Sequence, residues 1–370
     1  MNLLNLVFVG FLGWTSVLTF GVSELISPTE LPSPKTKIEI IKTDSGNSGF
    51  DTITTVAEVD SCVEQTIENE FRYKKYWSSA QDYSIIHLEQ DSVALDFLNS
   101  ANVQFWKRNI QLSEDSFLVV NQRNRQVLDV LPKKAVLSIE NGQNLKSLAA
   151  IYRNLSTDSI EPTIKFVRGR KSFFNYEGIG QHLEQGMRIF AEHDVNPMIC
   201  QMLLLIESPS NPRGISVSGA AGHFQLMPSV AKRYGLRVVA PYNRYHAGDE
   251  RYNFTKSAHV AARLVKGYCI PQAKMVCKTL NLEPDLDALW FNLLVLHIYN
   301  AGGGTLNHVA KNIHREFKDG NELIVTLWST RIGRFGNSSQ NYSQLCLASY
   351  LSYSEFLESK NWVKNDELRF

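Results

Sequence analysis

The most regular apolar pattern of the chain lies in residues 197–207. Ile199, Met202, Leu203 and Ile206 recur there at intervals of three and four residues. This spacing is typical of a helix that turns one face toward a core. The pattern therefore predicts a helix packed against other elements.

Residues at both ends of this segment suit the predicted helix. Asn196 can cap its first turn, Pro197 fits the first helical position, and Pro209 ends the run. Glu207 lies beside the apolar stripe at the C-terminal end, where the helix dipole disfavours negative charge and burial raises the pKa of a carboxyl group. Both effects favour the protonated form that a general acid needs. An ordinary surface glutamate would fit the same position, so the helix alone leaves both interpretations open.

Two later segments place polar side chains next to glycines. Residues 219–228 (GAAGHFQLMP) combine two glycines, one glutamine and a Met-Pro pair, which predicts a tight loop running into a short helix. Residues 289–298 form another apolar helical segment, and Tyr299, Asn300 and three glycines within residues 301–304 follow it. A helix ending of this kind can turn a phenol and an amide into a cleft.

The first half of the chain is less regular. Within residues 61–165 the pattern predicts helices at 63–75 and 92–108, followed by strands at 117–120 and 135–139. No motif is identified in this region.

Taken together and in this order, the segments resemble the lytic transglycosylases with a goose-lysozyme-like (SLT) catalytic domain. The motifs that carry the resemblance are Glu207-Ser208, Ser216, Gly219, Gly222, Gln225, Met227-Pro228 and Tyr299-Asn300-Ala301-Gly302. Asp249-Glu250-Arg251 and a helix expected at 179–193 are most similar to the membrane-bound lytic murein transglycosylases of the D type. The likeness covers roughly residues 166–350. It implies a mainly α fold, with a lysozyme-like catalytic domain and an N-terminal, largely helical extension.

The resemblance also implies a reaction and a substrate. The substrate would be the β-1,4 bond between N-acetylmuramic acid and N-acetylglucosamine in peptidoglycan glycan strands. Glu207 would protonate the leaving oxygen and then take the proton from the muramic acid C6 hydroxyl, which attacks C1 of its own ring. The product carries a 1,6-anhydro end. Because an intramolecular nucleophile has a large effective molarity, no protein nucleophile is needed.

The acids that follow Glu207 discriminate between two reactions. No Asp or Glu lies between Ser208 and Gly248. Glycosidases normally use two carboxylates, and a goose-type lysozyme, which hydrolyses the same bond with water, would be expected to place an Asp soon after its catalytic Glu. For Asp249 and Glu250 we expect a structural role in capping or in pairing near Arg251. The interval therefore favours the transglycosylase over the goose-type hydrolase.

The resemblance assigns substrate contacts around Glu207. Gln225 and Asn300 would hydrogen-bond sugar hydroxyls or acetamido groups, and Tyr299 would lie within reach of Glu207. Met227 would line the groove. The expected substrate-binding residues are Ser208, Ser216, Gln225, Met227, Tyr299, Asn300 and Tyr342. For the two serines, a role as turn caps fits the sequence equally well.

Three positions depart from the family pattern. His223-Phe224 stands where relatives have Leu-Met or Leu-Trp, which predicts a changed lining of the sugar groove. His297 and Ile298 stand where small residues are usual. Beyond Gly333, Ser338-Ser339-Gln340-Asn341 precedes Tyr342 where relatives have a Glu-Thr-Arg run, so the acid of that run is missing. We expect His223 to be a groove wall or surface group rather than an acid or base. These departures, together with the unmatched residues 61–165, motivate the alternative of a catalytically weak peptidoglycan-binding scaffold.

The N-terminus predicts export. Residues 3–22 form an uncharged, mostly apolar run, and Gly21-Val22-Ser23 offers the small-x-small pattern of a signal peptidase site. The run lacks a preceding Lys or Arg, and at about twenty residues it is long enough to remain as an inner-membrane anchor. Cleavage and retention both stay open. Either outcome places the protein in the periplasm or cell envelope.

These patterns suggest five parts along the chain. They are a signal peptide or membrane anchor (1–23), a Pro-, Ser-, Thr- and Lys-rich flexible linker (24–60), an N-terminal region (61–165), the catalytic domain (166–350) and a C-terminal tail that ends loosely after a helix (351–370). The N-terminal region could extend the helical domain, bind an envelope protein partner or target the wall.

Cysteine and histidine positions bear on disulfides and metals. Cys269 and Cys277 bracket Pro271 in what is expected to be a loop, so they are the best candidates for a bridge. Cys200 is expected to be a small buried residue. The histidines are dispersed, without HExxH or paired CxxC spacing, so we expect no metal site.

The composition does not suggest strong electrostatic binding of nucleic acid, and no nucleic-acid partner is expected. The chain has 38 basic and 37 acidic residues, which gives a formal net charge of +1. The glycine run at 302–304 follows a helix rather than a strand, so it is no phosphate loop. No cofactor is expected.

Overall fold

The computed structural model describes residues 72–77, 82–88, 92–137, 142–155, 162–209, 211–336, 338–359 and 363–369. All of them belong to one compact unit. The expected export signal and linker lie outside the described residues, as does Cys62. Within the part of the chain that is described, no helix is both long enough and apolar enough to cross a membrane.

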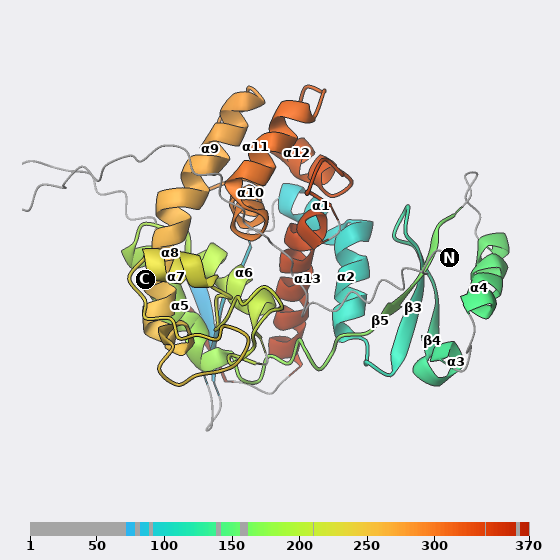
Figure 1. Cartoon of the computed structure of the whole chain (residues 1–370), viewed down its shortest axis with the longest axis horizontal. Coiled ribbons are helices and arrows are strands. Elements are labelled where there is room, and N and C mark those ends of the chain that lie inside the picture. The colour runs from blue at the N-terminus through green and yellow to red at the C-terminus, as the bar shows by residue number, and fades with distance from the viewer. Residues whose placement is uncertain are drawn as a thin grey trace, which may run out of the picture. The chain divides into compact units, whose positions relative to one another are not determined.

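The elements up to residue 168 mix strands and helices (Figure 1). They are β1 (Arg72–Trp77), β2 (Asp82–Ile86), α1 (Ser92–Asn99), α2 (Ala101–Gln111), β3 (Ser116–Asn121), β4 (Val127–Pro132), α3 (Lys133–Leu137), α4 (Gly142–Leu155) and β5 (Ile164–Arg168). The strands form two antiparallel three-stranded sheets, ordered β4-β3-β5 and β2-β1-β6.

The remaining elements are helical until the last strand. They are α5 (Gly180–Glu192), α6 (Pro197–Glu207), α7 (Pro228–Arg233), η1 (Glu250–Tyr252), α8 (Phe254–Leu264), η2 (Val265–Cys269), α9 (Ile270–Thr279), α10 (Leu289–Ala301), α11 (Gly303–Asn312), α12 (Gly320–Leu327), α13 (Ser338–Glu358) and β6 (Val363–Arg369). The mainly α fold class is thus confirmed.

Three predicted elements are wrong. The C-terminal part of the helix predicted at 63–75 is strand β1, which pairs with β2 on one side and β6 on the other. Residues 133–137 form helix α3 where a strand was predicted, because a short apolar run fits either element. The expected loose tail contains β6, whose pairing partner is distant in sequence.

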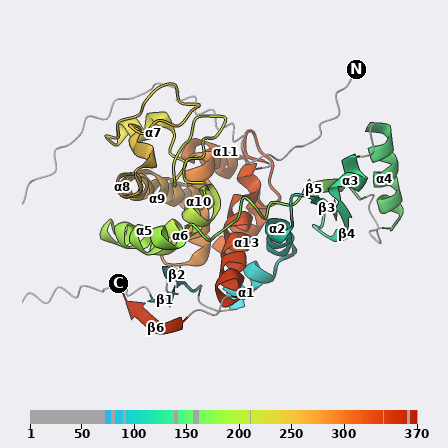
Figure 2. The ribbon, with the colours of Figure 1, turned by 90° about the horizontal axis from the view of Figure 1, so that it is seen from below.

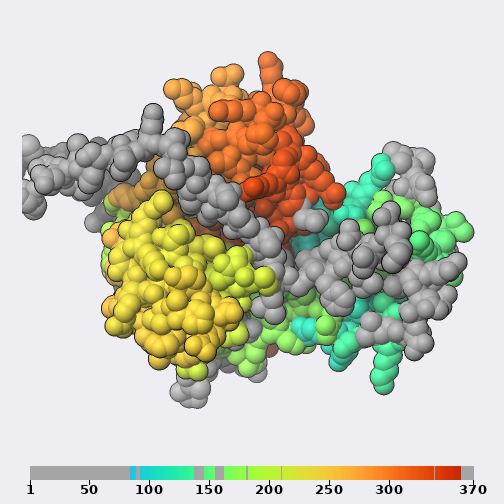
Figure 3. Space-filling model, in the orientation of Figure 1, coloured from blue at the N-terminus to red at the C-terminus, as the bar shows by residue number. Residues whose placement is uncertain are grey.

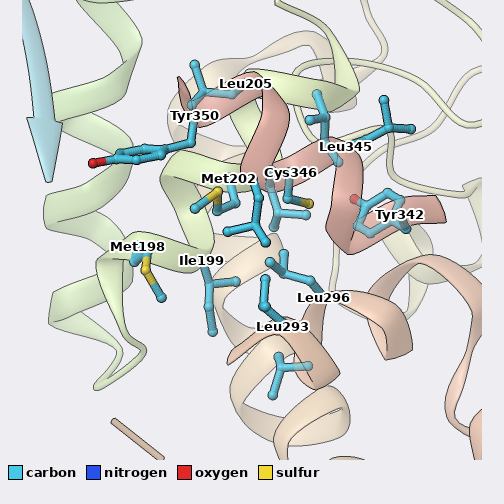
Figure 4. Packing of buried hydrophobic residues seen from close by; sticks show 14 of the residues in the cluster. Met198, Ile199, Met202, Leu205, Leu293, Leu296, Tyr342, Leu345, Cys346 and Tyr350 are labelled. Carbon is cyan, nitrogen blue, oxygen red and sulfur yellow. The ribbon is translucent and has the colours of Figure 1, made fainter. Parts of the chain in front are cut away.

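Helix α6 lies at the centre of the core. Its first residue follows the predicted cap, since the Asn196 side chain accepts a hydrogen bond from the Met198 amide at 3.0 Å. Every residue from Pro197 to Ile206 is buried, so the helix is covered on all sides rather than on one face. Figure 4 shows its side chains meeting those of α10 and α13, among them Met202, Leu296 and Cys346.

The core continues across the predicted boundary at residue 165. Helix α13 lies between α6 and α2 (Figures 1 and 2), and the Trp106 indole on α2 donates to Gln344 Oε1 on α13 at 3.1 Å. Strand β2 packs against α5 and α6. There the Gln201 side chain accepts from the Ile86 amide at 2.7 Å and donates to the Ile86 carbonyl at 3.0 Å. The division into domains stays a prediction.

The predicted bridge between Cys269 and Cys277 is wrong, because both thiols are free and buried. Residues 265–279 are continuously helical, with the π-helical turn η2 leading directly into α9. Eight residues along a helix rise by about 12 Å, whereas the Cα atoms of a disulfide lie about 4.4–6.8 Å apart. Pro271 is tolerated at the start of α9. The expected burial of Cys200 is confirmed.

Candidate active site

Glu207 ends helix α6 and keeps part of its surface exposed. Burial of the carboxyl group raises its pKa from 4.5 to about 7, although a hydrogen bond from Tyr342 acts in the opposite direction. The raised pKa agrees with the expectation from the sequence. At neutral pH the Glu207 carboxyl group is therefore protonated in part of the molecules and ionised in the others. A residue that first donates and then accepts a proton needs both forms to be accessible.

Tyr342 is the direct partner of this carboxyl group. Its hydroxyl donates to Glu207 Oε1 at 2.5 Å, and the residue is fully buried on α13. Burial, and next the charge of Glu207, raise the pKa of Tyr342 well above the usual value. The phenol therefore remains protonated and acts as a donor to Glu207.

A second phenol, Tyr299, comes from the last turn of α10. Its hydroxyl donates to the Phe224 carbonyl at 2.7 Å, which ties α10 to the glycine loop. Burial raises its pKa well above the usual value, and the charge of Glu207 adds to the effect. The structure thus brings Glu207, Tyr299 and Tyr342 together from three helices.

Within the described residues, no second carboxyl group is among the causes that shift the pKa of Glu207. Within the described residues, the groups whose pKa values respond to its charge are Tyr299, Tyr342 and Cys346. The two causes that shift the pKa of Glu207 itself are burial and the Tyr342 hydroxyl. The pairing of carboxylates that hydrolytic glycosidases use is therefore not found in the described part of the chain.

The glycine loop, residues 219–228, is tightly folded. Gly219 and Gly222 have φ values of 85° and 79°, which favour glycine, and Gln225 also lies in the left-handed region at 44°. A Cβ atom on Gly222 would come within 2.0 Å of the Arg251 carbonyl oxygen. The loop can therefore approach η1 this closely only with glycine at position 222.

The buried ion pair of Arg251 and Asp249 holds the glycine loop in place. Arg251 Nη1 donates to the carbonyls of Gly219 at 2.6 Å and Leu226 at 3.1 Å, while Nη2 donates to Asp249 Oδ2 at 2.8 Å. Asp249 also caps η1 by accepting from the Arg251 amide at 3.1 Å. Glu250 pairs with Lys256 at 2.6 Å. The structural role expected for both acids is confirmed.

Other expected contact residues bind the backbone of the loop. Gln225 Nε2 donates to the carbonyls of Gly214 at 3.1 Å and Gly222 at 2.9 Å, so the donor side of the amide is engaged. The Ser208 hydroxyl donates to the His223 carbonyl at 3.1 Å, and the Ser216 hydroxyl accepts from the Ala220 amide at 2.9 Å. Ser216 thus caps a turn, whereas Ser208 joins the end of α6 to the glycine loop.

Two further expected contact residues, Asn300 and Met227, are partly buried. The Oδ1 atom of Asn300 has no hydrogen-bond partner among the described residues. Met227 lies at the start of α7. The residues from the end of α6 to η1 are coloured yellow-green to yellow in Figure 3, where they gather in one lobe.

The expected change in groove lining at His223-Phe224 is wrong. Phe224 is fully buried and His223 is 8% exposed, so neither lines a groove. The His223 ring packs against His182 on α5, at 4.7 Å between centroids, and against Phe254 on α8, at 5.0 Å. Burial, and next the charge of His182, lower the pKa of His223 to about 4. The ring is therefore neutral and belongs to the packing of the loop.

Two features of the site were missed from the sequence. The sequence presents Arg251 only as part of a motif, and its burial against two loop carbonyls depends on a loop about thirty residues earlier. In the sequence His297 is only a departure from small residues, and its partners lie on another helix.

Metal binding is a separate question. Among the described residues, no group of three or more His, Cys, Asp or Glu side chains could hold a metal ion.

Comparison with known families agrees with this geometry. Residues 190–321 match the family model described as the transglycosylase SLT domain. The matched range includes Glu207, the glycine loop and Tyr299-Asn300, and it ends before Tyr342. A search of the curated proteins finds no match. Residues 190–321 are thus similar to the transglycosylase SLT domain, and this match supports the likeness to the peptidoglycan lytic transglycosylases.

Proposed function

We propose that the protein cleaves the β-1,4 bond between N-acetylmuramic acid and N-acetylglucosamine in peptidoglycan and leaves a 1,6-anhydromuramic acid end. One observation carries the proposal. Glu207 has a pKa of about 7 and is hydrogen-bonded by a phenol, while no second carboxyl group acts on it within the described residues. A lone acid with this pKa suits a reaction whose nucleophile belongs to the substrate.

In the first step, the protonated Glu207 donates its proton to the glycosidic oxygen, and the bond from that oxygen to C1 of muramic acid breaks. The Tyr342 hydroxyl stabilises the carboxylate that forms, because it donates to Oε1. A hydrogen bond that is stronger to the carboxylate than to the acid lowers the barrier to this proton transfer.

In the second step, the C6 hydroxyl attacks C1 of the same ring. The Glu207 carboxylate accepts the hydroxyl proton, so the enzyme returns to its starting form and no water is consumed. An Asp or Glu that activates water is not required in this sequence of events. This route is supported by the causes that shift the pKa of Glu207, because within the described residues they include no carboxyl group.

The substrate contacts follow from the groups that remain available. The Gln225 side-chain carbonyl oxygen would accept from an acetamido N–H or a sugar hydroxyl, since only its amide nitrogen is engaged. Asn300 Oδ1 has no hydrogen-bond partner among the described residues but is buried, so it would have to become accessible to make the same contact. Met227 would offer an apolar wall, and Tyr299 would hold the loop against α10. Ser208 and Ser216 would act by shaping the loop.

The proposed location is the periplasm or cell envelope, where peptidoglycan is found. The SLT match supports an envelope substrate, and the apolar run at 3–22 motivates export or anchoring. An envelope protein partner for residues 61–165 remains part of this proposal, although much of that region packs into the same core as the catalytic helix.

The test is digestion of purified peptidoglycan, followed by mass spectrometry of the released muropeptides. Anhydro ends are the expected product. Reducing ends would instead identify a hydrolase, and an absence of products would identify a scaffold. Glu207→Gln is expected to abolish product while retaining the fold, because the amide cannot donate the proton. The matched control is Glu283→Gln, an exposed glutamate outside the site, and unchanged turnover in Glu207→Gln would overturn the assignment.

A further inference from the structure

A histidine lies buried among apolar residues two positions before Tyr299. His297 is fully buried in the middle of α10, and its ring packs against Phe335 at 5.6 Å between centroids. Burial lowers its pKa to about 4, although a hydrogen bond to the Ser339 carbonyl acts in the opposite direction. The ring is therefore neutral wherever Glu207 titrates.

Both ring nitrogens of His297 bind the N-terminal part of α13. Nδ1 lies 2.9 Å from the Ser339 carbonyl oxygen, which can only accept, so Nδ1 carries the proton. Nε2 then accepts from the Ser343 hydroxyl at 2.8 Å. The Trp328 indole donates to the same hydroxyl oxygen at 2.8 Å. One tautomer thus satisfies every partner in the network.

The residues bound by His297 flank Tyr342. Ser343 follows it directly and Ser339 precedes it by three positions, so both lie within one turn of its Cα atom. Two neighbours are also held: Gln340 Nε2 donates to the Trp328 carbonyl at 2.6 Å, and Asn341 accepts from Arg125 at 3.0 Å. The turn that carries Tyr342 is therefore fixed by hydrogen bonds to residues outside α13.

Helix α10 consequently bears on the position of both phenols: it carries Tyr299, and it binds the helix that carries Tyr342. Through Tyr299 it binds the glycine loop, and through His297 it binds the helix that carries Tyr342. Because His297 and Tyr299 lie two positions apart on the same helix, that helix determines the positions of both phenols relative to Glu207. An alanine at position 297 could not make either of the bonds to α13.

We propose that His297 is a positioning residue that, through Ser339 and Ser343, holds the Tyr342 hydroxyl on Glu207. The proposal rests on the proposed function, in which Glu207 is the acid and base. It assigns the histidine no contact with substrate. It predicts that loosening this network makes Glu207 a weaker acid, because the carboxylate loses its donor.

The decisive experiment is a titration of Glu207 without substrate. The ¹³C resonance of the side-chain carboxyl is followed against pH in the full chain, and the signal is assigned by its loss in Glu207→Gln. In His297→Ala and Ser343→Ala the apparent pKa of Glu207 is expected to rise by at least about half a pH unit. The groups facing the carboxyl are Tyr299 on α10, together with Tyr342 and Cys346 on α13.

A conservative variant and a second background separate positioning from general destabilisation. The carbonyl of His297→Gln can still accept from Ser343, so this variant is expected to restore much of the wild-type titration. In a Tyr342→Phe background, where the hydroxyl is already absent, His297→Ala is expected to add no further change in the pKa of Glu207. An equal change in both backgrounds would overturn the proposal.

Turnover of soluble glycan strands gives an independent readout. His297→Ala is expected to lower kcat by about 10-fold or more and leave KM within about 2-fold, because the misplaced group acts on chemistry rather than on binding. His314→Gln, at an exposed histidine, is the control and is expected to match the wild type. If His297→Ala does not fold, Ser343→Ala, which removes a single oxygen atom, decides the question.

The titration also separates failure of this proposal from failure of the proposed function. Activity in Glu207→Gln would overturn the function but leave the titration interpretable. An unchanged Glu207 titration in folded His297→Ala and Ser343→Ala would overturn the positioning role, even if Glu207 proved essential for turnover.

Discussion

Glu207 holds a proton in the folded protein over a pH range in which an unfolded glutamate has lost it. Its pKa is about 7 in the structure against a usual value of 4.5. Between these values the folded state binds more protons than the unfolded state, so the free energy of unfolding falls as pH rises through this window. The carboxyl group therefore lowers stability above neutral pH and not below pH 4.5.

Glu207→Gln is accordingly expected to raise the free energy of unfolding at about pH 8, by roughly 1–3 kcal/mol, and to change it little at about pH 4. The neutral amide avoids the cost of burying a charge. Urea denaturation at both pH values measures the difference, with Glu283→Gln as the exposed control. An equal effect at the two pH values would show that the change is not linked to ionisation.

The sequence predicted some residues of the site better than others. Glu207 could be found because a cap, a proline and an apolar stripe place it at a helix end. His223 could not be placed correctly, since it faces α5 and α8 rather than a groove, and nothing local determines which helices pass a loop. The role of His297 likewise depends on a helix that begins about forty residues later.

At the scale of elements, the glycine loop is held by charge rather than by apolar packing alone. Arg251 and Asp249 are almost fully buried, and the guanidinium reaches two loop carbonyls. Removing one partner of a buried pair leaves the other charge unsatisfied. The exposed pair of Glu250 and Lys256 lies in the same segment and offers a direct contrast.

Asp249→Asn is expected to lower the free energy of unfolding by about 3–5 kcal/mol, because Arg251 would keep a buried charge without its counter-ion. Loss of activity is expected at temperatures below the main unfolding transition, as the loop loosens first. Differential scanning calorimetry and activity after mild heating provide the measurements. Lys256→Met is the control, for which little change is expected. Comparable losses in the two variants would contradict a special role for the buried pair.

Helices were predicted more accurately than strands, for a physical reason. The periodicity of α6 and α10 is a local property, and both were found in the sequence. Strand β1 depends on partners at residues 82–86 and 363–369, which its own sequence does not reveal. The π-helical turn before α9 was also hidden, because Pro271 indicates a break although it fits the first turn of the following helix.

For the whole molecule, helix α6, which carries Glu207, depends on a strand outside the SLT match. Gln201 of α6 satisfies both the amide and the carbonyl of Ile86 in β2, and all of these groups are buried. A backbone donor and acceptor that lose their partner away from water each cost free energy. The N-terminal elements are thus coupled to the site through backbone groups as well as through apolar contact.

Gln201→Leu is expected to destabilise the protein by roughly 2–4 kcal/mol, since the leucine fills a similar volume but leaves both groups of Ile86 unsatisfied. Amide hydrogen exchange should accelerate in β1 and β2 before it does in α10. Gln185→Leu, at an exposed position of α5, is the control. Unchanged exchange in the strands would show that β2 is held by other contacts.

The pairing of β1 with β6 joins the first and last strands that the structure describes. In the order of synthesis, β1 is made long before its second neighbour, and until then one of its edges lacks a partner. An unpaired strand edge can bind foreign chains and attract chaperones or proteases. A chain interrupted before residue 363 would therefore leave this edge of β1 without its β6 partner.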